Sequence, residues 1–234
     1  MRETHFIVKN INHLRERISH AAARSGRGVN EITVVAVSKT FPVESILAAY
    51  ESGLRQFGEN PLQAWESKQP KLAHLNAKWH FIGHLQSNKV RKAAQLFDRV
   101  DSIDSIPLAS KLNAAAAEAK KRLPILIEVH LSNEPTKGGV AEGDLAGLAD
   151  AVVQLPNLHL LGLMTIPPYC EEPGQARPYF RKLRELRDDL SQKLDTALPV
   201  LSMGMSHDFE VAIEEGATEI RIGSDIFGER AKDA

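Results

Sequence analysis

Lys39 is the residue whose type and position point most directly to covalent chemistry. It follows an apolar, β-branched run over residues 32–37, which predicts a strand buried on both sides. Because side chains alternate along a strand, Val35, Val37 and Lys39 share one face, and the amine stands at the mouth of a barrel if the valines point inward. Partial burial favours a neutral amine, which condenses with an aldehyde to give a Schiff base. The alternative is a strand-end lysine that extends into water.

Hydroxyl and backbone donors near the end of the chain indicate an anion site. Ser206 precedes an expected helix that it or Asp208 would cap, and the free N–H groups at a helix start bind anions. Gly223 and Ser224 follow the last expected strand, where the glycine lets the backbone approach a ligand and the serine adds a hydroxyl. Phosphate commonly binds beyond strands seven and eight of a parallel barrel, so both segments fit a phosphate site. The alternative is an ordinary helix cap.

Arg221 is expected inside the barrel. It shares a strand face with Glu219 and Gly223, whereas the neighbouring isoleucines share the other face and suit the layer between strands and helices. A buried guanidinium must have an acceptor, which is either a ligand or an internal carboxylate such as Glu219 or Asp104. An aldehyde phosphate fits the amine and the anion site, and pyridoxal phosphate (PLP) adds a ring nitrogen that can accept from Arg221.

Alternating strands and helices must position these residues. The expected strands are 32–39, 55–59, 79–83, 99–104, 124–131, 158–165, 200–205 and 219–223. Helices are expected near 43–52, 61–73, 87–96, 106–121, 142–154, 175–195 and 208–215, after a first amphipathic helix with Ile7, Ile11, Leu14 and Ile18 on one face. The alternation predicts an α/β fold, a (β/α)₈ TIM barrel with an extra N-terminal helix, as one domain over residues 1–234. The rival is an open doubly wound sheet, whose G-x-G-x-x-G signature is absent after the first strand.

Composition excludes several classes of protein. The 234 residues are 43% hydrophobic and 25% charged, which excludes a disordered chain, a collagen and a simple coiled coil. The 29 basic and 30 acidic residues nearly cancel, so we expect no general attraction to nucleic acid or to an anionic membrane. Cys170 is the single cysteine, which excludes an internal disulfide and fits a cytoplasmic location. The sequence has no apolar stretch of about 18 residues, and its N-terminus lacks the pattern of a secretory signal.

Several segments resemble one known family. They are AVSKTFP (36–42), QFGEN (56–60), WHFIGHLQSNK (79–89), GLMTI (162–166), LSMGMSHDFEVAI (201–213) and RIGSDIFG (221–228). In this order they resemble the pyridoxal phosphate homeostasis proteins, which are similar to the barrel domain of alanine racemases. The resemblance spans nearly the whole chain and implies PLP as the cofactor.

The same resemblance implies a role for particular residues. Lys39 matches the lysine that holds PLP as a Schiff base, and Arg221 matches the arginine that faces the pyridine nitrogen. The other matched cofactor-binding positions are Val37 beside the ring, Asn60 near the cofactor, and Ser206, Gly223 and Ser224, with Met205 beside them, at the phosphate. The family's usual tyrosine after QFGEN is Pro61 here, so any contact from that phenol is lost. His207 occupies a variable position and receives no role.

Three further residues have two interpretations each. His84 follows a strand end and either faces the mouth or is structural, and the same choice applies to His80. Lys137, with two glycines after it, belongs either to an anion loop or to a flexible turn. Neither H-E-x-x-H nor another metal-binding spacing occurs, so no metal site is expected.

The resemblance implies binding rather than catalysis. An arginine opposite the ring nitrogen keeps that nitrogen unprotonated and makes PLP a weaker electron sink. Racemisation tolerates this but typically needs a second acid/base, which alanine racemases take from a C-terminal domain that we do not expect here. We therefore expect a monomer or weak homodimer that holds PLP, buffers it, and passes it to or withholds it from PLP-dependent apo-enzymes. The alternatives are a PLP-dependent amino-acid racemase of low activity and a class I aldolase-type barrel that uses Lys39 on a sugar phosphate.

Overall fold

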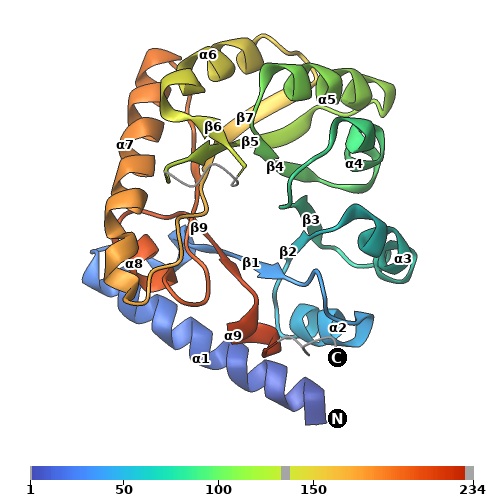
Figure 1. Cartoon of the computed structure of the whole chain (residues 1–234). Helices are drawn as coiled ribbons and strands as arrows, with labels where there is room; N and C mark the ends of the chain where they lie inside the picture. Colours follow the sequence, from blue (N-terminus) through green and yellow to red (C-terminus); the bar gives the residue numbers. More distant parts are fainter. Residues whose placement is uncertain (1, 133–137, 230–234) are drawn as a thin grey trace.

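A computed structural model describes residues 2–132 and 138–229, and within these ranges eight parallel strands close into a barrel (Figure 1). The strands are β1 (Thr33–Val37), β2 (Gln56–Glu59), β3 (Lys78–Phe81), β4 (Arg99–Ile103), β5 (Leu123–His130), β7 (Leu158–Met164), β8 (Val200–Ser202) and β9 (Glu219–Ile222). Pairing of β4 with β5, and of β1 with β9, completes the circle. This closure confirms the predicted barrel and excludes the open sheet. A short extra strand, β6 (Val140–Ala141), pairs with the end of β5.

Helices surround the barrel on its outer side (Figure 1). They are α1 (Arg2–Arg24), α2 (Val43–Glu51), α3 (Leu62–Leu72), α4 (Val90–Leu96), α5 (Ile106–Glu118), α6 (Glu142–Val153), α7 (Arg177–Lys193), α8 (Phe209–Glu214) and α9 (Ser224–Phe227). The expected helices over 87–96 and 175–195 begin as 3₁₀ turns, at Ser87–Lys89 and Pro173–Ala176, and a further 3₁₀ turn covers Val29–Glu31. Across the described segments, no helix combines the length and the apolar character needed to span a membrane.

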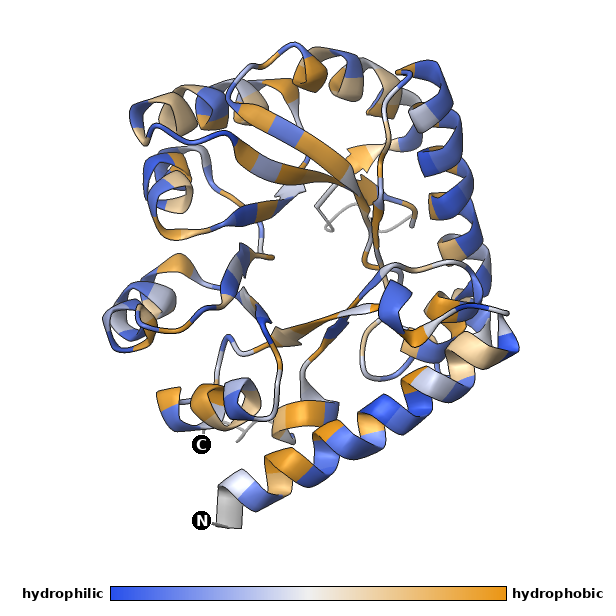
Figure 2. Ribbon diagram, turned by 180° about the vertical axis from the view of Figure 1, so that it is seen from behind, coloured by the Kyte–Doolittle hydropathy of each residue, from blue (hydrophilic) through white to orange (hydrophobic). Residues whose placement is uncertain are grey.

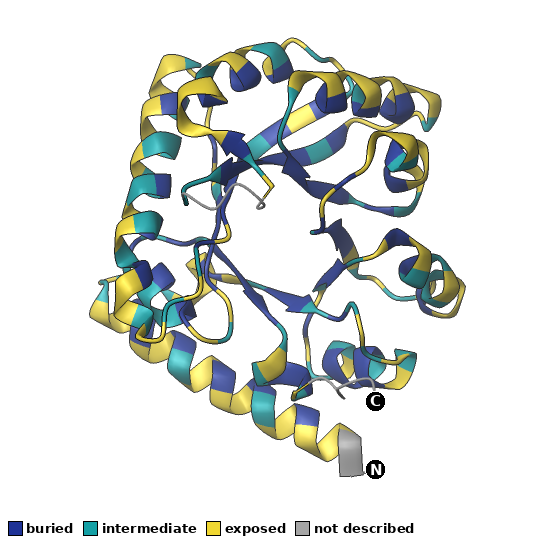
Figure 3. Ribbon diagram, in the orientation of Figure 1, coloured by how far each residue is buried: buried dark blue, intermediate teal, exposed yellow. Residues whose placement is uncertain are grey.

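The main apolar core lies between the strands and the helices. The strands are almost entirely buried, whereas the helices show buried and exposed residues in turn (Figure 3). Helix α1 carries hydrophobic and hydrophilic residues in the same alternation (Figure 2), and its apolar face buries the predicted set Ile7, Ile11, Leu14 and Ile18. On β9, Ile220 and Ile222 face this layer with no exposed surface. The predicted division of β9 into an apolar outer face and a polar inner face is therefore confirmed.

The interior of the barrel, by contrast, contains charged side chains. The guanidinium of Arg99 donates to the carboxylate of Asp101 at 2.6 and 2.8 Å and to that of Glu219 at 2.6 and 2.7 Å. All three residues are buried. Burial alone would raise the pKa of Asp101, but the charge of Arg99 outweighs it and holds this pKa well below its ordinary value. These three charged groups are stable in the interior only because each is paired with an opposite charge and hydrogen-bonded to it.

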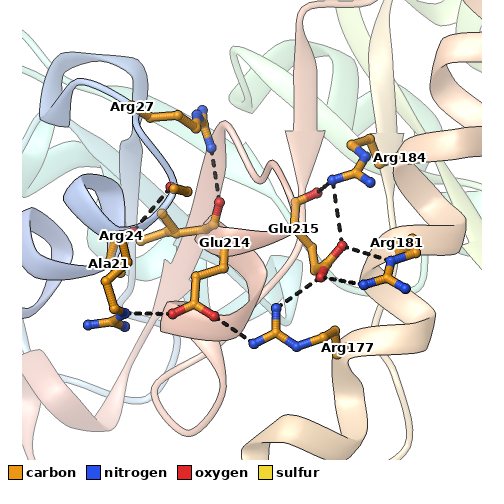
Figure 4. Close-up of polar contacts among 10 residues, drawn as sticks. Ala21, Arg24, Arg27, Arg177, Arg181, Arg184, Glu214 and Glu215 are labelled. Carbon is orange, nitrogen blue, oxygen red and sulfur yellow. Dashed lines mark hydrogen bonds and ion pairs between the residues drawn. The ribbon is translucent and has the colours of Figure 1, made fainter.

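A second ionic cluster joins α1, α7 and α8 on the outside of the barrel (Figure 4). Glu215 accepts hydrogen bonds from Arg177 at 2.9 Å and from Arg181 at 3.1 and 3.2 Å, and its side chain is only 6% exposed. Glu214 accepts from Arg24 of α1 at 2.8 Å and from Arg177 of α7 at 2.6 Å. Hydrogen bonds from Arg177 lower the pKa of Glu214. Burial would raise the pKa of Glu215, but the arginine contacts outweigh burial and lower it below its ordinary value of 4.5.

We predict that Glu215→Gln lowers the free energy of unfolding at pH 7 by about 1–3 kcal/mol, because a buried acceptor of charged hydrogen bonds is weakened. Since the folded-state pKa of Glu215 is depressed, its contribution is present above pH 4.5 and is lost as the pH falls through the folded-state value. The difference between variant and wild type in urea unfolding should therefore shrink below pH 4.5.

Glu185→Gln is the matched control, because Glu185 is an exposed carboxylate on α7, the helix that carries the arginines bound to Glu215, and the change removes the same charge. We expect it to alter the free energy of unfolding by no more than about 0.5 kcal/mol. A difference for Glu215→Gln that stays constant from pH 7 to pH 3 would contradict the assigned ionic role.

Candidate functional site

A cavity of about 380 Å³ lies at the carboxyl ends of the barrel strands. It is lined by Val37, Lys39, Met205, Ser206, Arg221, Gly223 and Ser224, which the sequence had singled out. Asn60 is the exception, because it is absent from the lining and packs against Gly83 instead, where a Cβ atom would come within 2.2 Å of the Asn60 amide carbon. Residues from the two ends of the chain meet here because β1 pairs with β9, with Val35 in register with Arg221.

Arg221 reaches this cavity from inside the barrel and is almost fully buried. Its Nη1 donates to the Ser202 hydroxyl at 2.8 Å, and its Nη2 donates to the Thr165 carbonyl at 2.8 Å. Glu219, one of the carboxylates considered as its partner, accepts instead from Arg99. Burial lowers the pKa of Arg221, and the negative charges of nearby carboxylates, chiefly Glu219 and Asp101, counteract this effect. Two neutral acceptors thus aim a cationic group at the cavity.

A buried ion pair fixes the backbone on both sides of Lys39. The ammonium group of Lys68, on α3, lies 2.8 and 2.9 Å from the two carboxylate oxygens of Glu59. It also donates to the carbonyls of Ser38 at 3.0 Å and Phe41 at 3.4 Å. The Ser38 hydroxyl donates to Glu59 at 2.7 Å. Lys39 is therefore carried by a stretch of chain held at both ends.

No local pattern in the sequence predicts this ion pair. Glu59 lies in the segment QFGEN that carried the resemblance, but nothing in the spacing links it to Lys68 nine residues later. Burial raises the pKa of Glu59, while the charge and hydrogen bonds of Lys68 counteract the rise. An exposed helical lysine and one that reaches a buried carboxylate look alike in a sequence.

The turn after β8 has a backbone that only glycine accommodates. Gly204 has a φ of +90°, and a Cβ atom there would lie 2.5 Å from Ala212 Cβ and 2.9 Å from Phe209 Cα. The Asp208 carboxylate accepts from the Met205 N–H at 2.7 Å, and burial raises the pKa of Asp208. Asp208 occupies the N-cap position of α8, as the sequence suggested, but its side chain makes no capping hydrogen bond and instead closes the turn that precedes the helix.

The Ser206 hydroxyl joins this turn to the one after β9. It accepts from the backbone N–H of Asp225 at 3.3 Å. Of the two candidate cap residues, Asp208 therefore occupies the N-cap position of α8 and Ser206 does not. Ser206 and Ser224 instead lie on neighbouring turns at one side of the cavity.

Other residues complete the cavity wall. They are Thr40, Phe41, Ile82, Ile166, His207 and Gly228. The period of two along β3 places Ile82 on the same face as His80, so that contribution was readable from the sequence. His207 Nε2 lies 2.9 Å from the Cys170 carbonyl, and its ring stacks on exposed Tyr169.

Two histidines and a lysine considered earlier have other locations. His80 is buried in the barrel with Nε2 at 2.8 Å from Gln56 Oε1, which favours the structural interpretation. His84 is largely exposed, with Nδ1 at 3.7 Å from Asp104, and is not part of the cavity wall. Lys137 lies outside the described residues.

Within the described ranges, one cluster has ligand atoms close enough for a metal ion: His80, Asp101 and Glu219, within 4.8 Å of one another. Arg99 already donates to both carboxylates. A guanidinium in this position supplies the positive charge that a metal would bring, so the cluster is better explained as an ionic network.

The wall of the cavity offers an amine, a guanidinium and the three hydroxyls of Thr40, Ser206 and Ser224. Its volume lies near the lower end of the usual range for small-molecule sites, about 300–1,000 Å³. The amine can form a covalent bond with a carbonyl carbon, and the hydroxyls can donate to an anion. The set suits a small, flat, anionic aldehyde.

Comparison with known sequences places the chain in a family. The family model described as "Alanine racemase, N-terminal domain" matches residues 10–231. The pyridoxal phosphate homeostasis protein of Aquifex aeolicus is 50% identical over 215 residues, which cover 92% of this chain and 94% of that protein. The protein of the same name from Escherichia coli is 42% identical over 231 residues, covering 96% and 97%.

Solved structures agree with this placement. The structure of PipY from Synechococcus elongatus with PLP bound has a TM-score of 0.84 and 34% identity, covering 95% of this chain and 100% of that one. Alanine racemase of Clostridium difficile, at 12% identity, shares the fold with a TM-score of 0.73, covering 97% of this chain and 58% of that one. The chain therefore belongs to the alanine racemase N-terminal domain family and, within it, to the pyridoxal phosphate homeostasis proteins.

Proposed function

We propose that the protein binds PLP as a Schiff base on Lys39 and takes part in PLP homeostasis without catalytic turnover. The observation that carries this proposal is one cavity that brings together the Lys39 amine, the Arg221 guanidinium and the hydroxyl-bearing turns of Ser206 and Ser224. The PLP-bound structure of PipY supports it, since that protein is 34% identical over almost the whole chain. PLP supplies an aldehyde that condenses with the lysine amine and releases one water molecule.

Gly223 favours a ligand at the phosphate end of the cavity. Its backbone has a φ of −112°, which any residue adopts, and a Cβ atom there would make only an ordinary contact of 3.6 Å with Val37. The packing of the protein therefore does not require glycine at this position. We infer that the ligand does, because the missing side chain leaves room beside Ser206 and Ser224 for a phosphate.

Arg221 determines what chemistry the site favours. Held by Ser202 and Thr165, it presents a permanent donor at the place assigned to the ring nitrogen. A cation there keeps the nitrogen unprotonated and limits withdrawal of electrons from bound substrates. This feature supports storage of the cofactor over decarboxylation or transamination.

The cavity wall offers little for proton transfer. Besides Lys39 and Arg221, the titratable group in the described lining is His207. Its Nε2 lies 2.9 and 3.1 Å from the carbonyls of Cys170 and Glu171, so this nitrogen acts as a donor and is unavailable as a base. A low-activity amino-acid racemase remains the second candidate, because the racemase fold is shared.

The proposal extends to the surroundings of the protein. We infer a cytoplasmic monomer or weak homodimer that passes PLP to, or withholds it from, PLP-dependent apo-enzymes. The near balance of charge supports small-molecule and protein partners over nucleic acid.

We predict that the full chain mixed with PLP becomes yellow, and that borohydride bleaches the colour and leaves the reduced adduct on Lys39. Lys39→Ala should show no such band and should lose at least about tenfold in PLP affinity, since the covalent bond is absent. Lys111→Ala, an exposed lysine on α5, is the control and should behave as wild type. Mass spectrometry of the reduced peptide is the measurement, and an adduct on another lysine would refute the assignment.

Gly223→Ala should fold as well as wild type, with a free energy of unfolding unchanged or raised by up to about 1 kcal/mol. Its PLP affinity should fall about tenfold or more, because the new methyl group occupies space assigned to the phosphate. Gly143→Ala on α6, where no atom lies within 4 Å of the added Cβ, is the matched control. Equal PLP affinity for both variants in equilibrium titrations would place the phosphate elsewhere.

We predict that the PLP-loaded protein leaves L-alanine unracemised in a chiral assay over hours, because in the described wall the one further side chain that could act as a base is His207, whose Nε2 is bound to backbone carbonyls. Lys39→Ala serves as the blank. Formation of D-alanine that is lost in this variant would overturn the proposal of a non-catalytic protein.

A further inference from the structure

The N-terminal helix α1 lies outside the repeating strand–helix units but contacts the last two of them. It runs along α8 and α9, on the outer side of the barrel (Figure 1). Its apolar face accounts for the packing, since Ile11, Leu14 and Ile18 are buried. One charged side chain of α1, that of Arg17, also reaches α8 and α9 and is 28% exposed.

Arg17 contacts both of these helices. Its Nε donates to Glu210 Oε1 at 2.8 Å, and its Nη1 donates to Asp225 Oδ2 at 2.5 Å. Its guanidinium carbon lies 4.5 Å from the centre of the Phe209 ring, in cation–π contact. The hydrogen bond that Arg17 donates to Glu210 raises the pKa of Arg17, so the guanidinium is charged at any physiological pH. One side chain therefore joins α8 to α9.

Both partners of Arg17 lie next to turns of the proposed phosphate site. Glu210 is the second residue of α8, directly after the turn that carries Ser206. Asp225 directly follows Ser224, and its backbone N–H donates to the Ser206 hydroxyl. The guanidinium thus bridges residues next to the two turns whose serines, Ser206 and Ser224, line the cavity.

The charges of Arg17, Glu210 and Asp225 also connect this contact with the phosphate site. Without Arg17, Glu210 and Asp225 would be two carboxylates close to a site meant for an anion, and each would oppose phosphate binding. With Arg17, their charges are partly neutralised and their positions are fixed by directed hydrogen bonds. A lysine could not donate to both carboxylates in the same planar arrangement.

We propose that Arg17 is a positioning residue that holds the Ser206 turn and the Ser224 turn at the separation at which both hydroxyls can donate to one phosphate group. The inference rests on the proposed function, because it takes the phosphate of PLP to be bound by these turns. It gives the extra helix α1 a role in ligand selection, namely the preference for phosphorylated over unphosphorylated pyridoxal.

The test compares two ligands, PLP and pyridoxal, which share the aldehyde and the ring and differ in the phosphate. The full-length protein is titrated with each, and the ratio of the dissociation constant for pyridoxal to that for PLP is the measured quantity. A general loss of stability lowers both affinities and leaves this ratio unchanged, whereas displaced phosphate donors lower it. Because the same two ligands are used throughout, their intrinsic chemical differences cancel between variants.

We expect Arg17→Met to lower the ratio about tenfold, a size typical of losing the residue that orients a direct ligand. Arg24→Met is the matched control, since Arg24 lies on the same helix and binds Glu214, at the far end of α8, at the same distance of 2.8 Å (Figure 4). We expect it to leave the ratio within about twofold of wild type. Asp225→Asn removes the charge that Arg17 binds on α9 and keeps Arg17 itself. If Arg17→Met does not fold, the ratio measured for Asp225→Asn tests the role of Arg17.

The outcomes separate the two proposals. Ser206→Ala combined with Ser224→Ala should lower the ratio, and failure to do so would overturn the phosphate assignment itself. If that double variant lowers the ratio while Arg17→Met and Asp225→Asn match Arg24→Met, the phosphate site stands and the role of Arg17 is refuted.

Discussion

The buried salt bridge between Arg99 and the carboxylates of Asp101 and Glu219 is the interaction on which the arrangement of the barrel interior depends. It gives the first inward residue of β9 a partner, so that the next inward residue, Arg221, is left to bind the neutral acceptors Ser202 and Thr165. Without Arg99, the unpaired Glu219 carboxylate would compete with Ser202 and Thr165 for the Arg221 guanidinium. The charge at the bottom of the barrel thus keeps a cationic donor at its mouth.

A single strand therefore serves several purposes through its pleat. Along β9, inward residues supply the ion pair and then the arginine, and Gly223 follows at the cavity, while the outward isoleucines pack under the helices. Pairing with β1 sets Lys39 beside this series. The site follows from register and alternation, so it needs few contacts of its own beyond the ion pair of Lys68 and Glu59 that holds the lysine segment.

Much of this was predictable because it depends on periodicity. The buried strands, the amphipathic helix α1 and the inward direction of Arg221 all follow from apolar spacing, and the barrel follows from the alternation. Contacts between side chains distant in sequence were not predictable. Lys68 reaching Glu59, and Asp208 bonding back to Met205 instead of making a capping hydrogen bond to α8, depend on three-dimensional distances that no local pattern encodes. Asn60 is a further example. The resemblance of its motif places it near the cofactor, whereas in the structure it packs against Gly83 outside the cavity wall.

The pairing of the first strand with the last has a consequence for the order in which the protein matures. Lys39 is synthesised long before Arg221 and Ser224, and β1 has only β2 as a neighbour until β9 is synthesised. A nascent chain therefore carries Lys39 before it contains the arginine and the serine that line the same cavity. The cavity is in this way completed only after β9 has been synthesised and has paired with β1.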